Sequence, residues 1–162
     1  MLNIGDVAPD FAVTLPSGAR ATLGGMLKSG PVVLYFYPAD FTPVCTAEAC
    51  MYRDFEGDLT ERGVQVVGVS PQDEASHAKF RDQFRIAFPL VADPQRAVIR
   101  AYGASWPLGI GVRRVSYLIG ISQLIEDRVV ADLRVSEHVA FVERVLARVA
   151  KAPDAQTPTT RS

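Results

Sequence analysis

The sequence contains only two cysteines, Cys45 and Cys50, among its 162 residues. A small secreted scaffold held together by disulfides needs more, so a structural disulfide framework is excluded. An excess of one charge is also missing, because 17 Lys and Arg oppose 18 Asp and Glu and leave a formal net charge of −1. Nonspecific nucleic-acid binding depends on a positive excess that displaces counterions, so this class of function is disfavoured.

Long apolar runs are absent as well. The longest aliphatic and aromatic run, Val32 to Tyr37, is far too short to span a bilayer. Asp6 and Asp10 interrupt the N-terminal region, so we expect no signal peptide, no membrane partner and a cytoplasmic location. The composition, with 48% hydrophobic and 22% charged residues, is that of a soluble globular chain of about one domain.

We expect a single domain over residues 1–150. The segment 151–162 contains two prolines, three threonines and no large apolar residue. This composition is typical of a disordered tail.

Strand and helix signals alternate along the domain. Strands are predicted at 11–15, 32–37, 64–69, 89–92 and 115–119, with a hairpin inside 121–133 around Glu126 and Asp127. Helices are predicted at 44–62, 73–84, 94–102 (with Asp93 as the N-cap) and from Ser136 onward, and 106–112 is predicted to be a loop. This order predicts an α/β fold with a mixed central sheet flanked by helices.

The junction between the strand that ends at Tyr37 and the long helix is the candidate functional site. Thr42 is a good N-cap and Pro43 suits the first helical position, which puts Cys45 third in the helix. There the unpaired backbone N–H groups and the helix dipole favour an anion, so we expect a lowered thiol pKa at Cys45. The alternative is inert packing, the commoner role of a free cysteine.

The residues around Cys45 carry a more specific signal. Pro38-x-x-x-Thr42-x-x-Cys45 resembles the active-site signature of the peroxiredoxins. The wider stretch 35–50 resembles the bacterioferritin-comigratory, or peroxiredoxin Q, branch, in which a second cysteine stands five residues after the first. The resemblance covers nearly the whole chain before the tail. It implies a thioredoxin-like fold with an N-terminal β extension.

This resemblance implies a thiol peroxidase that reduces hydrogen peroxide and organic hydroperoxides. In it the Cys45 thiolate attacks the peroxide and becomes a sulfenic acid, the Thr42 hydroxyl hydrogen-bonds the peroxide, and Pro38 shields the thiolate. Complete ionisation of a thiol that is about 3% ionised at pH 7 gains only about thirtyfold. Larger acceleration needs a cation that stabilises the leaving oxygen.

The resemblance assigns that cation to Arg114, just ahead of the strand 115–119. Its neighbour Arg113 should face the opposite side, because adjacent strand residues alternate; without the family pattern, both would be solvated charges. Glu48, one helical turn after Cys45, is expected to hold the arginine. The alternative for Glu48 is an acid of the first turn that simply favours the helix dipole.

Cys50 is the implied resolving cysteine, which forms a disulfide with Cys45 that thioredoxin or a similar dithiol protein then reduces. Five residues on an ideal helix separate two Cα atoms by about 8.6 Å, whereas a disulfide needs less than about 7 Å. We therefore expect the first turns of the helix to unwind during turnover. The alternative is that Cys50 is a bystander core thiol.

No cofactor is implied, and a metal site is disfavoured because His77 and His138 lie far from the cysteines in sequence. We expect His77 to be a buried, hydrogen-bonded side chain and His138 to be solvated; Trp106 either lines the substrate entrance or anchors its loop. The expected assembly is a monomer or a weak homodimer. Two other functions remain open: a thioredoxin-like disulfide oxidoreductase and a redox-sensing module without peroxidase turnover.

Overall fold

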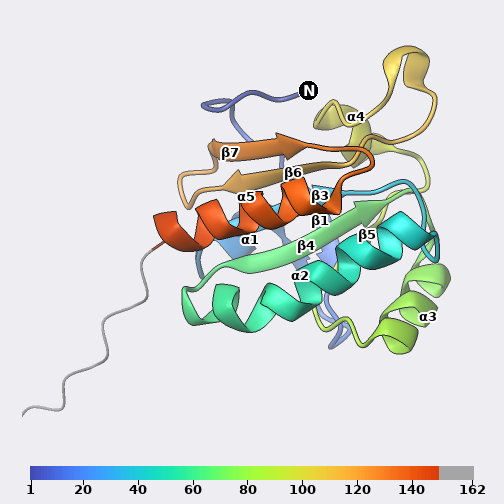
Figure 1. Cartoon of the computed structure of the whole chain (residues 1–162), viewed down its shortest axis with the longest axis horizontal. Helices are drawn as coiled ribbons and strands as arrows, with labels where there is room; N and C mark the ends of the chain where they lie inside the picture. The colour runs from blue at the N-terminus through green and yellow to red at the C-terminus, as the bar shows by residue number, and fades with distance from the viewer. Residues whose placement is uncertain (150–162) are drawn as a thin grey trace, which may run out of the picture.

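A five-stranded mixed sheet forms the centre of the computed structural model, which describes residues 1–149 (Figure 1). The strand order is β5-β4-β3-β6-β7. These strands are β3 (Val32–Phe36), β4 (Gln65–Ser70), β5 (Leu90–Ala92), β6 (Val115–Ile119) and β7 (Ile125–Val130). β3, β4 and β5 are parallel, whereas β6 and β7 pair antiparallel with their neighbours. The predicted mixed α/β architecture is confirmed.

A separate antiparallel pair, β1 (Ala12–Thr14) and β2 (Arg20–Thr22), forms the expected N-terminal β extension. The helices are α1 (Leu23–Leu27), α2 (Pro43–Glu61), α3 (Glu74–Phe84), α4 (Ala97–Ala101) and α5 (Val135–Arg148), with a 3₁₀ turn at Pro107–Gly109. Helices α2 and α5 cross the same face of the sheet, and α1 lies behind it (Figure 1). The sheet is therefore covered by helices on both faces.

The central strand β3 is buried throughout, because its side chains supply both halves of the core. Val32, Leu34 and Phe36 pack into one cluster with side chains of α1 and α4. Val33 and Tyr35 point the other way, into a cluster that contains side chains of α2, α3 and α5. A continuous apolar run is what a strand buried on both faces requires. The chain leaves β3 at the carboxyl edge of the parallel strands, where ligand sites form in sheets of this kind.

Two predicted elements are wrong in detail. The segment 121–133 does not contain a hairpin around Glu126 and Asp127, because both residues lie inside the single strand β7, and the turn that joins it to β6 lies at 120–123. Helix α4 begins at Ala97 rather than at residue 94. Arg96 adopts a left-handed conformation with φ of 58°, which a right-handed helix cannot contain.

Asp93 nevertheless serves the start of α4, since its carboxylate accepts hydrogen bonds from the amides of Ala97 and Ile99 at 2.9 and 2.8 Å. The short elements β2 and α1 have no counterpart in the sequence prediction. The expected tail, 151–162, lies outside the described residues. No helix within residues 1–149 combines the length and the apolar character that crossing a membrane requires.

Candidate active site

Helix α2 starts as its sequence predicts. Thr42 occupies the N-cap with φ −74° and ψ 148°, and Pro43 is the first helical residue, so Cys45 is the third. The Thr42 hydroxyl, however, makes no capping hydrogen bond. It donates instead to the carbonyl oxygen of Ala39 at 3.2 Å. The Thr42 hydroxyl therefore does not cap α2 in this conformation.

Cys45 is fully buried, whereas Cys50 is partly exposed, and both are free thiols. Both lie inside the continuous helix α2, where ideal geometry keeps their Cα atoms about 8.6 Å apart. Within residues 1–149, no hydrogen bond joins the Cys45 sulfur to Thr42 or Arg114. The structure brings the predicted residues to one region, but Cys45 lies sealed beneath the surface.

Arg114 is held in place by two elements. Its Nε donates to the carbonyl oxygen of Asp132 at 2.9 Å, and its backbone N–H donates to the Asp132 carboxylate at 3.0 Å. Its Nη1 donates to Oε2 of Glu48 at 3.2 Å. Because Glu48 is one turn beyond Cys45 on α2, this contact ties the guanidinium to the helix that carries the cysteine. Asp132 was missed by the sequence analysis, since an acid after an edge strand carries no recognisable signal.

Glu48 is not an acid of the first turn, so the helix-dipole alternative is wrong. The first turn of α2 contains no acidic residue, and Glu48 has no exposed surface. Burial raises the pKa of Glu48 to about 8, although the guanidinium of Arg114 lowers it in opposition. A carboxyl in this state changes its charge near physiological pH.

His138 is not solvated, contrary to the sequence prediction, because it is fully buried. The side chain points from the first turns of α5 toward β6, where its Nδ1 lies 2.9 Å from Ser116 Oγ and 3.4 Å from Glu48 Oε1. The error arose because the residue type alone favoured an exposed position for His138. A histidine whose two nitrogens both find partners can be buried in the core.

A second buried polar cluster supports the loop between β3 and α2. The Asp40 carboxylate accepts hydrogen bonds from the Tyr37 hydroxyl and the Ser76 hydroxyl, both at 2.7 Å, and lies 2.8 Å from His77 Nδ1. His77 Nε2 lies 3.1 Å from the carbonyl oxygen of Val91. The prediction that His77 is buried and hydrogen-bonded is confirmed. Asp40 was not identified from the sequence, although it anchors the loop that contains Pro38 and Thr42.

A cavity of about 210 Å³ opens beside Arg114, and Pro38, Trp106 and Asp132 also line it. Arg113 does not line the cavity, but its guanidinium binds the Asp132 carboxylate at 2.7 Å and lies 4.5 Å from the ring centroid of Trp106. Of the two arginines, Arg114 is the one that lines the cavity and binds Glu48. Cys45 does not line the cavity, so access to the sulfur requires movement of the loop or of the first helical turn.

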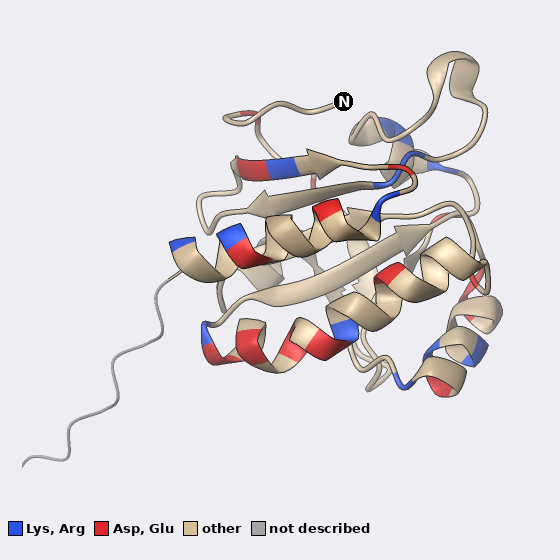
Figure 2. Ribbon diagram, viewed as in Figure 1, with Lys and Arg blue, Asp and Glu red and all other residues tan. Residues whose placement is uncertain are grey.

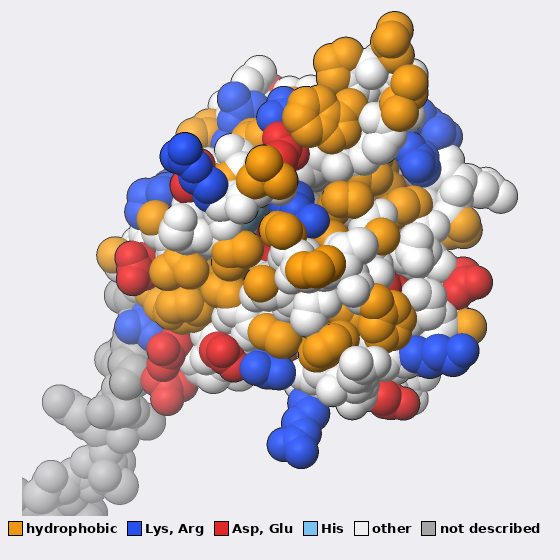
Figure 3. Space-filling model, turned by 45° about the vertical axis from the view of Figure 1, so that its right-hand side comes forward, with side chains coloured by type: hydrophobic (Ala, Val, Ile, Leu, Met, Phe, Trp, Pro, Cys, Tyr) orange, Lys and Arg blue, Asp and Glu red, His pale blue; other side chains and the backbone are white. Residues whose placement is uncertain are grey.

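Two exposed apolar side chains line this cavity, Trp106 and Leu133, which are 43% and 82% exposed. On the loop between α4 and β6, Leu108 and Ile110 are 95% and 72% exposed, and Figure 3 shows apolar side chains gathered where this loop protrudes. The rim is therefore apolar, while the floor contains the Arg114 guanidinium.

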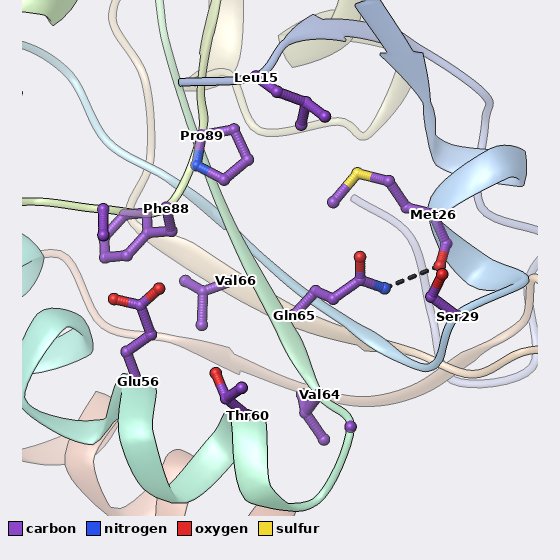
Figure 4. A pocket seen from close by; sticks show the side chains of 12 residues that line it. Leu15, Met26, Ser29, Glu56, Thr60, Val64, Gln65, Val66, Phe88 and Pro89 are labelled. Atoms are coloured by element: carbon purple, nitrogen blue, oxygen red, sulfur yellow. Dashed lines mark hydrogen bonds between the residues drawn. The ribbon is translucent and has the colours of Figure 1, made fainter. Parts of the chain in front are cut away.

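A larger cavity, of about 320 Å³, lies at the opposite end of α2. Figure 4 shows Glu56, Thr60, Val66 and Phe88 around it, together with Gln65, whose amide donates to the carbonyl oxygen of Met26 at 2.8 Å. None of the predicted site residues lines it. We assign the site to the smaller cavity, because only that one contains Arg114 and Pro38.

Charges are distributed unevenly along α2. Figure 2 shows that its acidic residues concentrate in the C-terminal half of the helix, away from Cys45 in the first turn. No group of three or more His, Cys, Asp or Glu in the described part of the chain is arranged to hold a metal ion. The candidate chemistry centres on a buried thiol that lies one helical turn before the glutamate which binds Arg114.

Comparison with known proteins agrees with this geometry. A putative peroxiredoxin of Mycobacterium tuberculosis is 44% identical over 103 residues, which cover 64% of this chain and 65% of that protein. The chain thus spans just under two thirds of that relative's length. The putative peroxiredoxin bcp of Coxiella burnetii is 33% identical over 147 residues, covering 87% of this chain and 96% of that protein.

The crystal structure of peroxidoxin BcpB from Mycobacterium tuberculosis superposes with a TM-score of 0.83 at 31% identity, covering 93% of this chain and 99% of that one. The sequence pattern of the AhpC/TSA family matches residues 4–128. The chain belongs to the AhpC/TSA family, in its branch of peroxiredoxin Q and bacterioferritin-comigratory proteins.

Proposed function

We propose that this protein is a thiol peroxidase that reduces hydrogen peroxide and organic hydroperoxides. The observation that carries the proposal is the placement of Cys45 in the first turn of α2, one turn from a glutamate that binds Arg114. The unpaired N–H groups of the first turn favour a thiolate, and a nearby guanidinium favours charge on a leaving oxygen. The apolar rim of the cavity suits the organic part of a hydroperoxide.

In the proposed reaction, the Cys45 thiolate attacks the terminal oxygen of the peroxide. The S–O bond forms as the O–O bond breaks, so the sulfur is oxidised by two electrons and the peroxide is reduced. The leaving hydroxide or alkoxide takes up a proton and departs as water or an alcohol, and Cys45 becomes a sulfenic acid. Arg114 stabilises the departing charge, and Thr42 and Pro38 shape the pocket.

Cys50 then resolves the sulfenic acid. Its thiol sulfur forms a disulfide with Cys45, and the hydroxyl of the sulfenic acid leaves as water. Intact helical geometry does not allow this bond, so the first turns of α2 unwind before it forms. Cys50 is partly exposed while the helix is intact, whereas Cys45 is buried. Opening of the helix start exposes Cys45 as well, which supports this step.

The disulfide returns to two thiols by exchange with thioredoxin or a similar dithiol protein, which is itself oxidised. We propose a monomer or weak homodimer located in the cytoplasm.

Peroxide consumption in the presence of a thioredoxin system tests the proposal. We expect turnover by the unaltered protein and none by Cys45→Ser. Cys50→Ser should consume about one equivalent of peroxide and then stop with Cys45 as a sulfenic acid, which a mass spectrum detects. Insulin reduction without peroxide consumption would instead identify a disulfide oxidoreductase, and the absence of both activities would identify a redox-sensing module.

A further inference from the structure

Glu48 binds Arg114 through Oε2, and its other oxygen, Oε1, faces His138. His138 is the end of a buried chain of hydrogen-bonded side chains that runs from Tyr52 through Ser116. This chain joins three elements, since Tyr52 lies on α2, Ser116 on β6 and His138 on α5, and Figure 1 shows where these elements lie. Nothing in the proposed reaction uses this chain.

The hydrogen-bond partners of His138 assign its tautomer. Its Nε2 lies 3.0 Å from the carbonyl oxygen of Ala131, which can only accept, so Nε2 carries a hydrogen. Burial lowers the pKa of His138 below its usual value, which favours the neutral ring. In the neutral ring, Nδ1 is an acceptor and points a lone pair toward Ser116 and Glu48.

Glu48 has an acceptor atom that also lacks a hydrogen. Its Oε1 is buried without a hydrogen-bond partner, and it lies 3.4 Å from His138 Nδ1. Two acceptor atoms facing each other in the core repel, whereas one proton between them turns the repulsion into an attraction. The contact of Oε2 with Arg114 measures 3.2 Å, longer than the 2.7 Å of the Arg113–Asp132 pair. Charge-assisted pairs are typically about 2.7–2.9 Å apart.

We propose that Glu48 and His138 hold one proton between Oε1 and Nδ1, and that His138 is thereby a positioning residue which keeps the charge of Arg114 available to the Cys45 site. The inference rests on the proposed peroxidase function. While the proton is present, the Glu48–His138 pair carries no net charge and Arg114 remains uncompensated. Once it is lost, the Glu48 carboxylate neutralises Arg114, and stabilisation of the leaving oxygen weakens.

The other titratable groups around this pair do not take over its proton. Burial raises the pKa of Tyr35, on β3, and of Tyr52, on α2, well above the usual value, so both phenols stay neutral. Arg114 disfavours a charged His138, while Asp132 and Glu137 favour it. The hydroxyls of Ser116 and Tyr52 can reverse their donor direction, so they accommodate the proton on either atom.

The pH dependence of the second-order rate constant with hydrogen peroxide tests the inference. We expect the rate to fall above pH about 8, where Glu48 loses its proton. Glu48→Gln carries permanent amide hydrogens and keeps an oxygen for Arg114, so its rate should show no fall in this range. A basic fall that persists unchanged in Glu48→Gln, or a variant inactive at every pH, overturns the inference. The absence of peroxidase activity in the unaltered protein would instead refute the proposed function.

Infrared spectroscopy of the resting protein gives a readout that does not depend on activity. A protonated, buried carboxyl should absorb at pH 7, disappear through pH about 8, and be missing from Glu48→Gln. His138→Phe removes the acceptor of this proton, and Glu48 is already fully buried. The loss of one hydrogen bond should therefore move the titration down by roughly 0.4–1 pH unit.

Glu143→Gln is the matched control, because Glu143 lies exposed on α5. It should leave both the infrared band and its titration unchanged. A resting protein without a protonated carboxyl band at pH 7 overturns the inference, and so does a His138→Phe titration that does not move.

Discussion

Replacing Asp40 by asparagine tests how the loop before α2 is held. The Asp40 and His77 side chains are 0% and 1% exposed, and the carboxylate takes three hydrogen bonds from the protein. Asparagine keeps the shape but only one acceptor oxygen, so at least one donor loses its partner inside the core. Leaving a buried donor without a partner costs about 1–3 kcal/mol, and we expect Asp40→Asn to lower the free energy of unfolding at pH 7 by that amount.

The same substitution has a predicted pH signature. Burial acts to raise the pKa of Asp40, but hydrogen bonds from His77, Ser76 and Tyr37 outweigh it and hold the pKa below its usual value. A carboxyl with a depressed pKa stabilises the fold fully above its unfolded value of about 3.9, and this contribution is lost as the pH falls through the lowered value. The stability difference between the unaltered protein and Asp40→Asn should therefore shrink below pH ~4.

Urea unfolding followed by circular dichroism, at pH values from 7 down toward 3, measures both effects. Asp54→Asn is the control, because Asp54 is 68% exposed in a surface pair with Arg53, and its loss should cost at most about 0.5 kcal/mol. A cost below about 1 kcal/mol for Asp40→Asn, or a difference that stays constant with pH, would refute the reasoning.

Four further outcomes are expected. Arg114→Lys cannot reproduce the directed N–H groups of the guanidinium, so the rate constant with peroxide should fall about a hundredfold in stopped-flow assays; an unchanged rate would contradict the role of Arg114. Hydrogen exchange of residues 42–52 should be faster in the disulfide form than in the dithiol form, and equal protection would argue against unwinding. Gly68→Ala puts a Cβ 2.7 Å from a Leu90 methyl carbon and should destabilise by about 1–3 kcal/mol. Gly57→Ala, on α2 with open space around it, should raise the free energy of unfolding by up to about 1 kcal/mol. If the two glycine substitutions shift the urea unfolding midpoint in the same direction, both expectations cannot hold.

The sequence predicted those parts of the fold that local chemistry determines. The run 32–37 identified the buried central strand, and Thr42 with Pro43 located the start of α2 to the residue. Hydrophobic periodicity and capping preferences act over a few residues, so they can be recognised in the sequence without knowledge of tertiary contacts. The same holds for the end of α2, predicted at residue 62 and observed at Glu61, with Gly63 just beyond it at a φ of 72°.

The errors fall where contacts distant in sequence decide the outcome. His138 is buried because Ser116 and Ala131 supply partners for its nitrogens, and neither can be inferred from helix 135–148 alone. Asp132 escaped notice for the same reason, since its role is to hold two arginines of another strand end. Arg96 adopts a left-handed conformation that its residue type does not favour, so α4 begins at Ala97 instead of residue 94.

The outermost strand also bears on how molecules of this protein meet in solution. β7 carries Glu126, Asp127 and Arg128 in succession, and the first two pair with Arg148 and Arg144 of α5. A charged rim of this kind discourages a neighbouring chain from adding a strand to the free border. Any self-association of this protein should therefore add no strand beside β7, and the border at β7 should resist fibrillar aggregation even when the molecule is concentrated.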